Sequence, residues 1–183
     1  MQTRYSYRLV STSVDAFLVI ASKREVRDYA DRPVPADVQR RILEAGRVAG
    51  SSANKQERRF VVVESDEAKR ALSETVYTPS NINGAAFAVG IVTDGSGPAP
   101  FDAGRAAQQM MLAAWNDGVG SCPNGMPDRA ATGSVLGVAE GEEPAIVLSF
   151  GYPAKPRDPE SRSAEEWLAA ANRKPFDEVV SRI

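Results

Sequence analysis

The 183-residue sequence contains no histidine and a single cysteine, Cys122. These two residue types supply most general bases, zinc ligands and activated nucleophiles, so their scarcity argues against a zinc site and against most side-chain catalysis. Redox chemistry in this chain would need a bound prosthetic group. A lone thiol cannot form an intramolecular disulfide, which favours a reducing cytoplasm. We expect Cys122 to be a buried apolar residue and expect no metal site.

Long hydrophobic runs are also missing. No apolar stretch approaches the ~18 residues that a membrane-spanning helix needs, and the formal net charge is only −2. A chain with this charge balance lacks the basic footprint of a nucleic-acid-binding protein. We therefore expect neither a membrane nor a nucleic-acid partner. The hydrophobic content of 43% fits one globular domain spanning residues 1–183.

Hydrophobic periodicity predicts alternating helices and strands. Asp102 and Gly118 fit the N-cap and the C′ position of the longest helix, and a turn-rich segment follows it. Ser163 and Glu166 form the pattern of a capping box. The predicted strands are 59–64, 85–92 and 145–150, and the other helices are one capped by Ser13, one opening with Pro35, 67–76 and 128–136.

Positive charge gathers just after the first predicted helix. Lys23, Arg24 and Arg27 fall within five residues of a chain that is slightly acidic overall. Such a cluster predicts a site for an anion, although cations at the end of a helix also offset its macrodipole without binding anything. The sequence has no GxxxxGK phosphate loop, so the anion would be held in another way.

Six segments of the sequence, taken in order, form a distinctive set: Lys23–Tyr29, Pro33–Pro35, Ser51–Phe60, Gln108–Ser121, Gly151–Pro153 and Arg173–Val180. No single segment is specific, but their order along the chain is. Over about residues 17–180 this ordered set resembles the FMN-dependent nitroreductase family.

The resemblance implies an α+β, three-layer α/β/α fold with a mixed, largely antiparallel sheet. It implies a domain-swapped homodimer in which residues from about 153 to 183 form a carboxy-terminal arm that packs on the partner subunit. The implied activity is that of an NAD(P)H oxidoreductase with FMN at the subunit interface. Hydride would pass by a ping-pong mechanism through flavin N5 to a small electron-poor acceptor, such as a nitroaromatic or a quinone. No side chain need act as a catalytic base, because the flavin carries the chemistry.

The resemblance also assigns roles to residues. Lys23 and Arg24 would bind the FMN phosphate together with a basic residue near the carboxy terminus, and Arg27 would face the pyrimidine edge. The backbone at Gly125 would approach flavin N5. The loop that carries Ser51, Ser52 and Asn54, called the serine-rich loop, would come from the second subunit. The complete set of predicted cofactor-binding residues is Lys23, Arg24, Glu25, Arg27, Ser51, Ser52, Asn54, Gln56, Asn124, Gly125, Arg173 and Lys174.

Other interpretations of these residues remain open. The serines, Asn54 and the Asn124–Gly125 pair are also ordinary turn formers. Glu25, Glu57 and Arg58 depart from the family pattern and predict a more charged pocket wall. The alternative functions are a flavin-consuming or dehalogenating relative, or a non-catalytic flavin- or nucleotide-binding protein.

Overall fold

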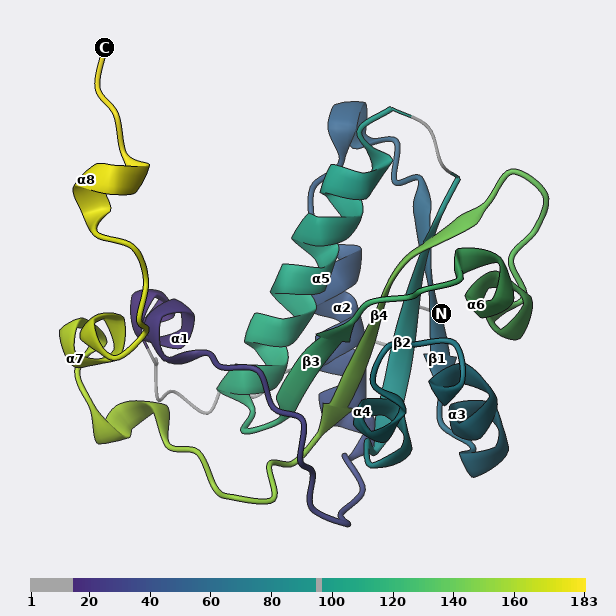
Figure 1. Ribbon diagram of the computed structural model, residues 1–183, viewed down its shortest axis with the longest axis horizontal. Helices are drawn as coiled ribbons and strands as arrows, with labels where there is room; N and C mark the ends of the chain where they lie inside the picture. The colour runs from purple at the N-terminus through teal and green to yellow at the C-terminus, as the bar shows by residue number, and fades with distance from the viewer. Residues whose placement is uncertain (1–14, 95–96) are drawn as a thin grey trace, which may run out of the picture.

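The computed structural model describes residues 15–94 and 97–183 and is built around a four-stranded sheet (Figure 1). The strand order is β1-β2-β4-β3, and every neighbouring pair runs antiparallel. An isolated parallel bridge joins Glu25 to Ser121. The segment that carries Lys23, Arg24 and Arg27, called the basic segment below, therefore runs alongside the edge strand β3. The strands are β1 (Arg58–Val63), β2 (Phe87–Thr93), β3 (Gly120–Asn124) and β4 (Glu143–Gly151).

Helices cover both faces of the sheet. Strand β2 is buried along its whole length: Phe87 and Val89 face the core shared with α2 and α5, while Ala88 faces the core shared with α3, α4 and α6. This alternation gives the sheet two apolar faces. The predicted three-layer α/β/α arrangement is therefore confirmed. The covering helices are α2 (Ala36–Arg47), α3 (Asp66–Ser73), α4 (Pro79–Asn83), α5 (Ala99–Asn116) and α6 (Arg129–Leu136).

Local sequence signals explain several helix ends. The Asp128 side chain accepts the Ala131 amide at the start of α6, as an N-cap should. Gly118 has φ +73° after the end of α5, a conformation that glycine adopts without steric cost. The predicted capping box at Ser163 is present in α7 (Ala164–Ala169), with both reciprocal hydrogen bonds.

Two local predictions are wrong. Helix α5 begins at Ala99, so Asp102 is not its N-cap but a buried residue of its first turns. The turn-rich segment after Gly118 contains β3, which lacks β-branched residues and is ordered by its pairing with β4. Ser13 lies outside the described residues, and the observed N-cap of α1 (Ala16–Ser22) is Asp15.

The two ends of the described chain meet beside the sheet rather than on it. Helix α1 packs against α7 and against the last turn of α5, where the Trp115 indole donates to the Ser22 hydroxyl over 3.0 Å. Helix α8 (Phe176–Val179) projects beyond α7, and Phe176 is 66% exposed (Figure 1). In the part of the chain that the structure describes, no helix is both long and apolar enough to cross a membrane.

Candidate functional site

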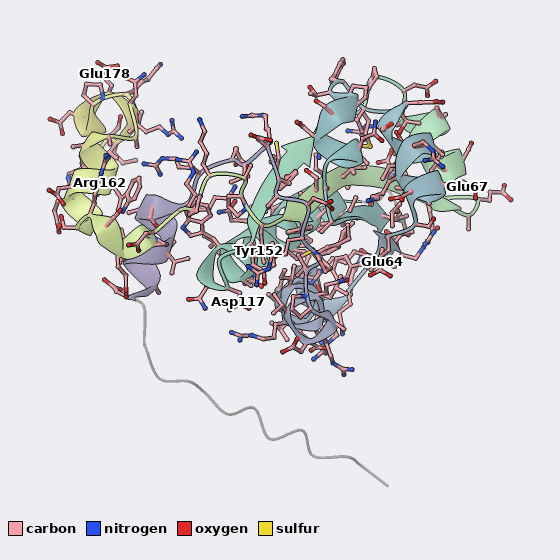
Figure 2. All side chains as sticks on the ribbon, turned by 90° about the horizontal axis from the view of Figure 1, so that it is seen from below. Glu64, Glu67, Asp117, Tyr152, Arg162 and Glu178 are labelled. Carbon is pink, nitrogen blue, oxygen red and sulfur yellow. The ribbon has the colours of Figure 1, made fainter. Side chains whose placement is uncertain are left out.

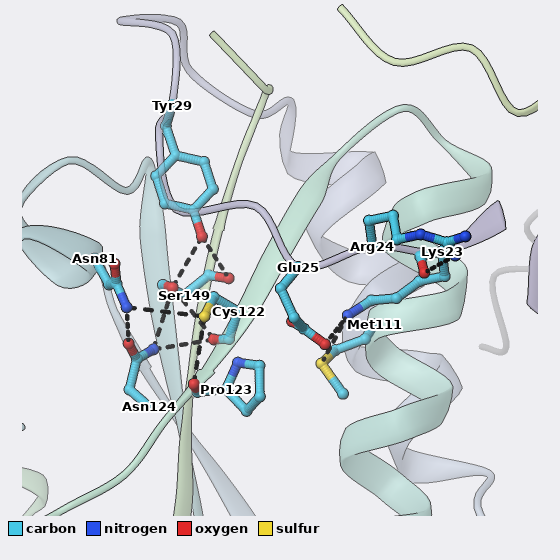
Figure 3. Close-up of polar contacts among 10 residues, drawn as sticks. All are labelled: Lys23, Arg24, Glu25, Tyr29, Asn81, Met111, Cys122, Pro123, Asn124 and Ser149. Carbon is cyan, nitrogen blue, oxygen red and sulfur yellow. Dashed lines mark hydrogen bonds and ion pairs between the residues drawn. The ribbon is translucent and has the colours of Figure 1, made fainter. Parts of the chain in front are cut away.

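Lys23 lies in the interior beside α5. Its ammonium group forms a 2.7 Å ion pair with Glu25 and lies 3.7 Å from the Met111 sulfur, and its side chain is only 7% exposed. Glu25, which departs from the family pattern, is the partner in this ion pair (Figure 3). Glu25 thus offsets part of the positive charge of the basic segment.

Arg24 holds α1 and α7 together. Its guanidinium donates to the carbonyl oxygens of Ala21, Lys23 and Trp167 at 2.7–2.9 Å and lies 5.1 Å from the centroid of the Trp167 ring. These contacts use three of the five guanidinium N–H groups, which leaves donors for a further ligand. Arg24 therefore has a structural role that the sequence did not reveal.

Arg27 borders a cavity of about 310 Å³. Lys155 and Arg157 line the same cavity, because a bridge between Tyr29 and Pro153 brings the segment after β4 against the basic segment. The sequence-based prediction did not include these two cations in the site, and the Lys-Pro-Arg run at residues 155–157, shortly after β4, was the available signal. The cavity is therefore richer in positive charge than predicted, although Glu25 and Asp28 also line it.

The predicted serine-rich loop includes the short 3-10 helix η1 (Ser52–Asn54). The Ser52 amide donates to the buried Asp102 carboxylate over 2.8 Å, and the Gln56 amide donates to the Ser51 hydroxyl over 2.9 Å. Asn54 and Gln56 have positive φ values of 55° and 60°, which are costly for residues with a side chain. Because Asp102 holds the loop in this conformation, the backbone polar groups of the loop are already oriented before any ligand binds.

Arg58 and Glu57 behave differently although both depart from the family pattern. The Arg58 guanidinium turns inward to the carbonyl oxygen of Ala49, while Glu57 pairs with Lys55 over 3.4 Å on the outside of the loop. One Arg58 nitrogen, Nη1, is buried and has no hydrogen-bond partner among the described residues. Arg58 thus stabilises the loop from its inner side and does not line its outer surface.

The serine-rich loop and the basic segment lie far apart in the single chain. The loop is fixed to Asp102 near the start of α5, whereas Lys23 contacts Met111 further along the same helix. At a rise of 1.5 Å per residue these two anchor points are about 14 Å apart along the helix axis. Figure 1 shows the connection between α2 and β1 at the opposite end of α5 from α1. One chain does not bring the two predicted halves of the site together.

Asn124 and Gly125 lie where β3 ends. Asn124 is 3% exposed and belongs to the interior, whereas the next residue, Gly125, is exposed, so its backbone can reach a ligand. A Cβ atom on Gly125 would lie 3.0 Å from the Tyr77 ring, a tight contact that this exposed ring would have to relieve by shifting. Burial raises the pKa of the neighbouring Cys122 thiol although the Arg27 charge opposes the shift, so Cys122 stays protonated.

Arg173 and Lys174 are exposed on the carboxy-terminal segment. The Arg173 guanidinium donates to the Ala171 carbonyl oxygen over 2.9 Å. Figure 2 shows this part of the chain, which includes Arg162 and Glu178, set to one side of the sheet and its covering helices. The two residues are not brought to the basic segment by any contact among the described residues.

Comparisons with known proteins agree with this architecture. The sequence model of the Nitroreductase family matches residues 20–94 and 93–152. A relative from Archaeoglobus fulgidus, provisionally named NADH dehydrogenase/NAD(P)H nitroreductase, is 29% identical over 150 residues, which cover 76% of this chain and 86% of the relative.

Two solved structures share the fold. A Desulfovibrio desulfuricans protein, solved in complex with FMN, has a TM-score of 0.79 at 24% identity and covers 94% of this chain and 98% of its own. The NADPH:FMN oxidoreductase of Vibrio harveyi, solved with NAD⁺, has a TM-score of 0.78 at 21% identity and covers 91% and 76%. With its family match extending over most of the sequence and its fold shared with these structures, the chain belongs to the nitroreductase family.

Proposed function

We propose that this protein is an FMN-dependent NAD(P)H oxidoreductase whose flavin sites are shared between two copies of the chain. The acceptor is a small electron-poor molecule such as a nitroaromatic or a quinone. When bound, FMN supplies the hydride chemistry, taking a hydride from NAD(P)H and passing it to the acceptor. The residues of the chain bind the flavin, orient it and set the electrostatic potential around it.

The observation that carries this proposal is the separation of the two halves of the site. The basic segment and the serine-rich loop are each well ordered by side-chain contacts, yet α5 keeps them about 14 Å apart along its axis. A second copy, packed with its α5 against the first, would bring the loop of one chain to the basic segment of the other. The relatives solved with FMN or NAD⁺ support the choice of ligands.

The face of α5 suits such a partner. Two cavities of about 380 and 570 Å³ open along it, and both are bordered by Pro100 and Gly104. Phe101 is 70% exposed on the same helix, and Met111 continues the face toward Lys23. Burying exposed apolar surface of this kind favours association. The exposed Phe176 of the carboxy-terminal arm would add a further apolar contact.

The residues fit a flavin phosphate ester in their chemistry. Arg27, Lys155 and Arg157 border one cavity, and cations near the pyrimidine ring favour the negative charge that it gains on reduction. Arg24 with Arg173 or Lys174 would bind the phosphate. Lys23 contributes less, because Glu25 already neutralises it.

Polar atoms without partners lie in both halves of the site. The Ser121 hydroxyl beside Glu25 is buried and has no hydrogen-bond partner among the described residues, and the same holds for Arg58 Nη1 beneath the serine-rich loop. Buried polar groups are normally satisfied, so such orphans are expected where a ligand or a partner completes the structure. At the end of β3, the absence of a side chain on Gly125 allows close backbone approach.

Reconstitution with FMN tests the proposal directly. The purified protein should bind about one FMN per chain and turn yellow, since two shared sites serve two chains. Anaerobic addition of NADH or NADPH should then bleach the visible absorption, which a spectrophotometer records. A colourless protein that ignores added FMN would overturn the function.

Replacing Arg27 removes the charge proposed for the pyrimidine edge. Arg27→Ala should raise the Kd for FMN by about tenfold or more, as the loss of one charge-assisted hydrogen bond does. It should also lower the midpoint potential, because the reduced flavin loses a nearby cation. Fluorescence titration and potentiometry measure both effects, and Arg27→Lys should preserve most of the potential. A wild-type potential in Arg27→Ala would remove this residue from the flavin.

Gly104 offers a test of the shared site, because a Cβ there has nothing within 4 Å and the residue is exposed in the single chain. Gly104→Glu should yield a monomer by sedimentation and release FMN, since a carboxylate would be buried in the α5 interface. The matched variant Gly104→Ala should remain dimeric and keep its flavin. A Gly104→Glu monomer that binds FMN as tightly as the wild type would contradict a shared site.

A further inference from the structure

A buried polar cluster lies behind the backbone that the proposed function brings to the flavin. We call it the Asn124 cluster, and Figure 3 shows its members converging between β3 and β4. Asn81, Asn124 and Ser149 are each at most 4% exposed. The cluster joins four separate parts of the chain. Its members are Tyr29 after α1, Asn81 of α4, Asn124 of β3 and Ser149 of β4.

The Asn124 carboxamide is the centre of the cluster. Its nitrogen donates to the Cys122 carbonyl oxygen over 3.0 Å and to the Ser149 hydroxyl over 3.2 Å. Its oxygen accepts from the Asn81 carboxamide nitrogen over 2.9 Å. Both ends of the carboxamide are thus engaged, and the side chain has one orientation that satisfies them. Asn124 therefore fixes the end of β3 to α4 and to β4.

Tyr29 extends the cluster to the basic segment. The Tyr29 hydroxyl lies 2.9 Å from the Ser149 hydroxyl oxygen and 3.3 Å from the Ser149 carbonyl oxygen. Burial raises the pKa of the Tyr29 phenol, so the hydroxyl keeps its proton and can donate at all pH values of interest. Arg27 lies only two residues before Tyr29. A continuous set of hydrogen bonds therefore connects the Arg27 segment to Asn124.

Gly125 is held on both sides. Asn124 precedes it and is fixed by the cluster, while the Gly125 carbonyl oxygen accepts the Tyr77 amide over 3.0 Å. The peptide between Asn124 and Gly125 carries the Gly125 amide, which the family resemblance directs at flavin N5. The direction of this N–H is therefore set by the hydrogen bonds of the Asn124 side chain on one side and of the Gly125 carbonyl oxygen on the other.

The contribution of the Asn124 cluster to the free energy of unfolding does not by itself explain why these polar side chains are buried. Burying several amide and hydroxyl groups costs desolvation free energy, and apolar side chains of similar volume fill an interior at lower cost. What a fully hydrogen-bonded cluster provides is a single defined geometry among the segments that it joins. The two segments joined here carry Arg27 and Gly125.

We propose that Tyr29, Asn81, Asn124 and Ser149 are positioning residues that fix the Gly125 amide relative to Arg27, and thereby tune the flavin that the proposed function places between them. This inference rests on the proposed function. It adds that the reactivity of the bound flavin depends on side chains that do not touch it. These side chains act through the direction of one backbone N–H and the position of one guanidinium.

Tyr29→Phe is the mildest test, because it removes one hydroxyl and keeps the ring that packs on Gly151. We expect kcat to fall about tenfold or more, since small misplacement of reacting groups is costly. KM for NAD(P)H should stay within about twofold and the flavin midpoint potential should shift, while FMN still binds. Tyr152→Phe is the matched control, because the Tyr152 hydroxyl has no hydrogen bond among the described residues. The contact of Tyr152 with the Arg32 guanidinium is made by its ring, which the substitution keeps.

Asn124→Ala should produce the same pattern more strongly, and Asn124→Gln should restore little because the longer side chain cannot reproduce the contacts. If Asn124→Ala does not fold, Tyr29→Phe decides. Wild-type kcat and midpoint potential in an FMN-loaded Tyr29→Phe would overturn the inference.

Amide exchange in the flavin-free protein separates the inference from the proposed function. Exchange at the Tyr77 amide, which donates to the Gly125 carbonyl oxygen, should be faster in Tyr29→Phe and Asn124→Ala than in the wild type and unchanged in Tyr152→Phe when followed by NMR. If wild-type protein fails to bind FMN but these exchange rates change, the proposed function fails while the positioning of Gly125 stands. Unchanged exchange in both variants overturns the positioning role whether or not FMN binds.

Discussion

Helix α5 sets the constraint on which the functional account depends. It anchors the serine-rich loop through Asp102 and the basic segment through Met111, and its rigidity keeps the two apart. The flavin of the proposed function would need polar groups from both segments, which one chain does not bring together. In the proposed dimer, the apolar cavities along the same helix would let a second α5 pack close enough to complete each site.

The three cations of the basic segment differ in how far contacts within the chain already occupy their charges. Within the basic segment, Glu25 neutralises Lys23 and the carbonyl oxygens at the ends of α1 and α7 occupy Arg24. Arg27 is therefore the member of the segment best suited to act on a ligand, and the segment after β4 strengthens its positive potential. A protein without histidine needs no more than this if a bound flavin carries the hydride, since the protein then supplies position and electrostatics.

How much the sequence predicts depends on how local the signal is. The capping box of Ser163 and Glu166 lies within four consecutive residues, so it could be predicted directly from the sequence. Strand β3 could not, because Gly120–Asn124 owes its extended form to a partner more than twenty residues away. Asp102 looks like a cap until the amide of Ser52, fifty positions earlier, is found on its carboxylate. The Asn124 cluster draws on four distant segments and left no pattern at all.

Subunit complementation tests the central claim most directly. Arg27→Ala damages the basic segment, and Asp102→Ala releases the serine-rich loop, so each variant alone should bind FMN weakly at both sites. In a dimer formed from one chain of each, one site would combine both defects and the other would be intact. Mixing the two variants under conditions of subunit exchange should therefore restore tight FMN binding at one site per mixed dimer. Binding that stays as weak as in either variant alone would contradict a site built from two chains.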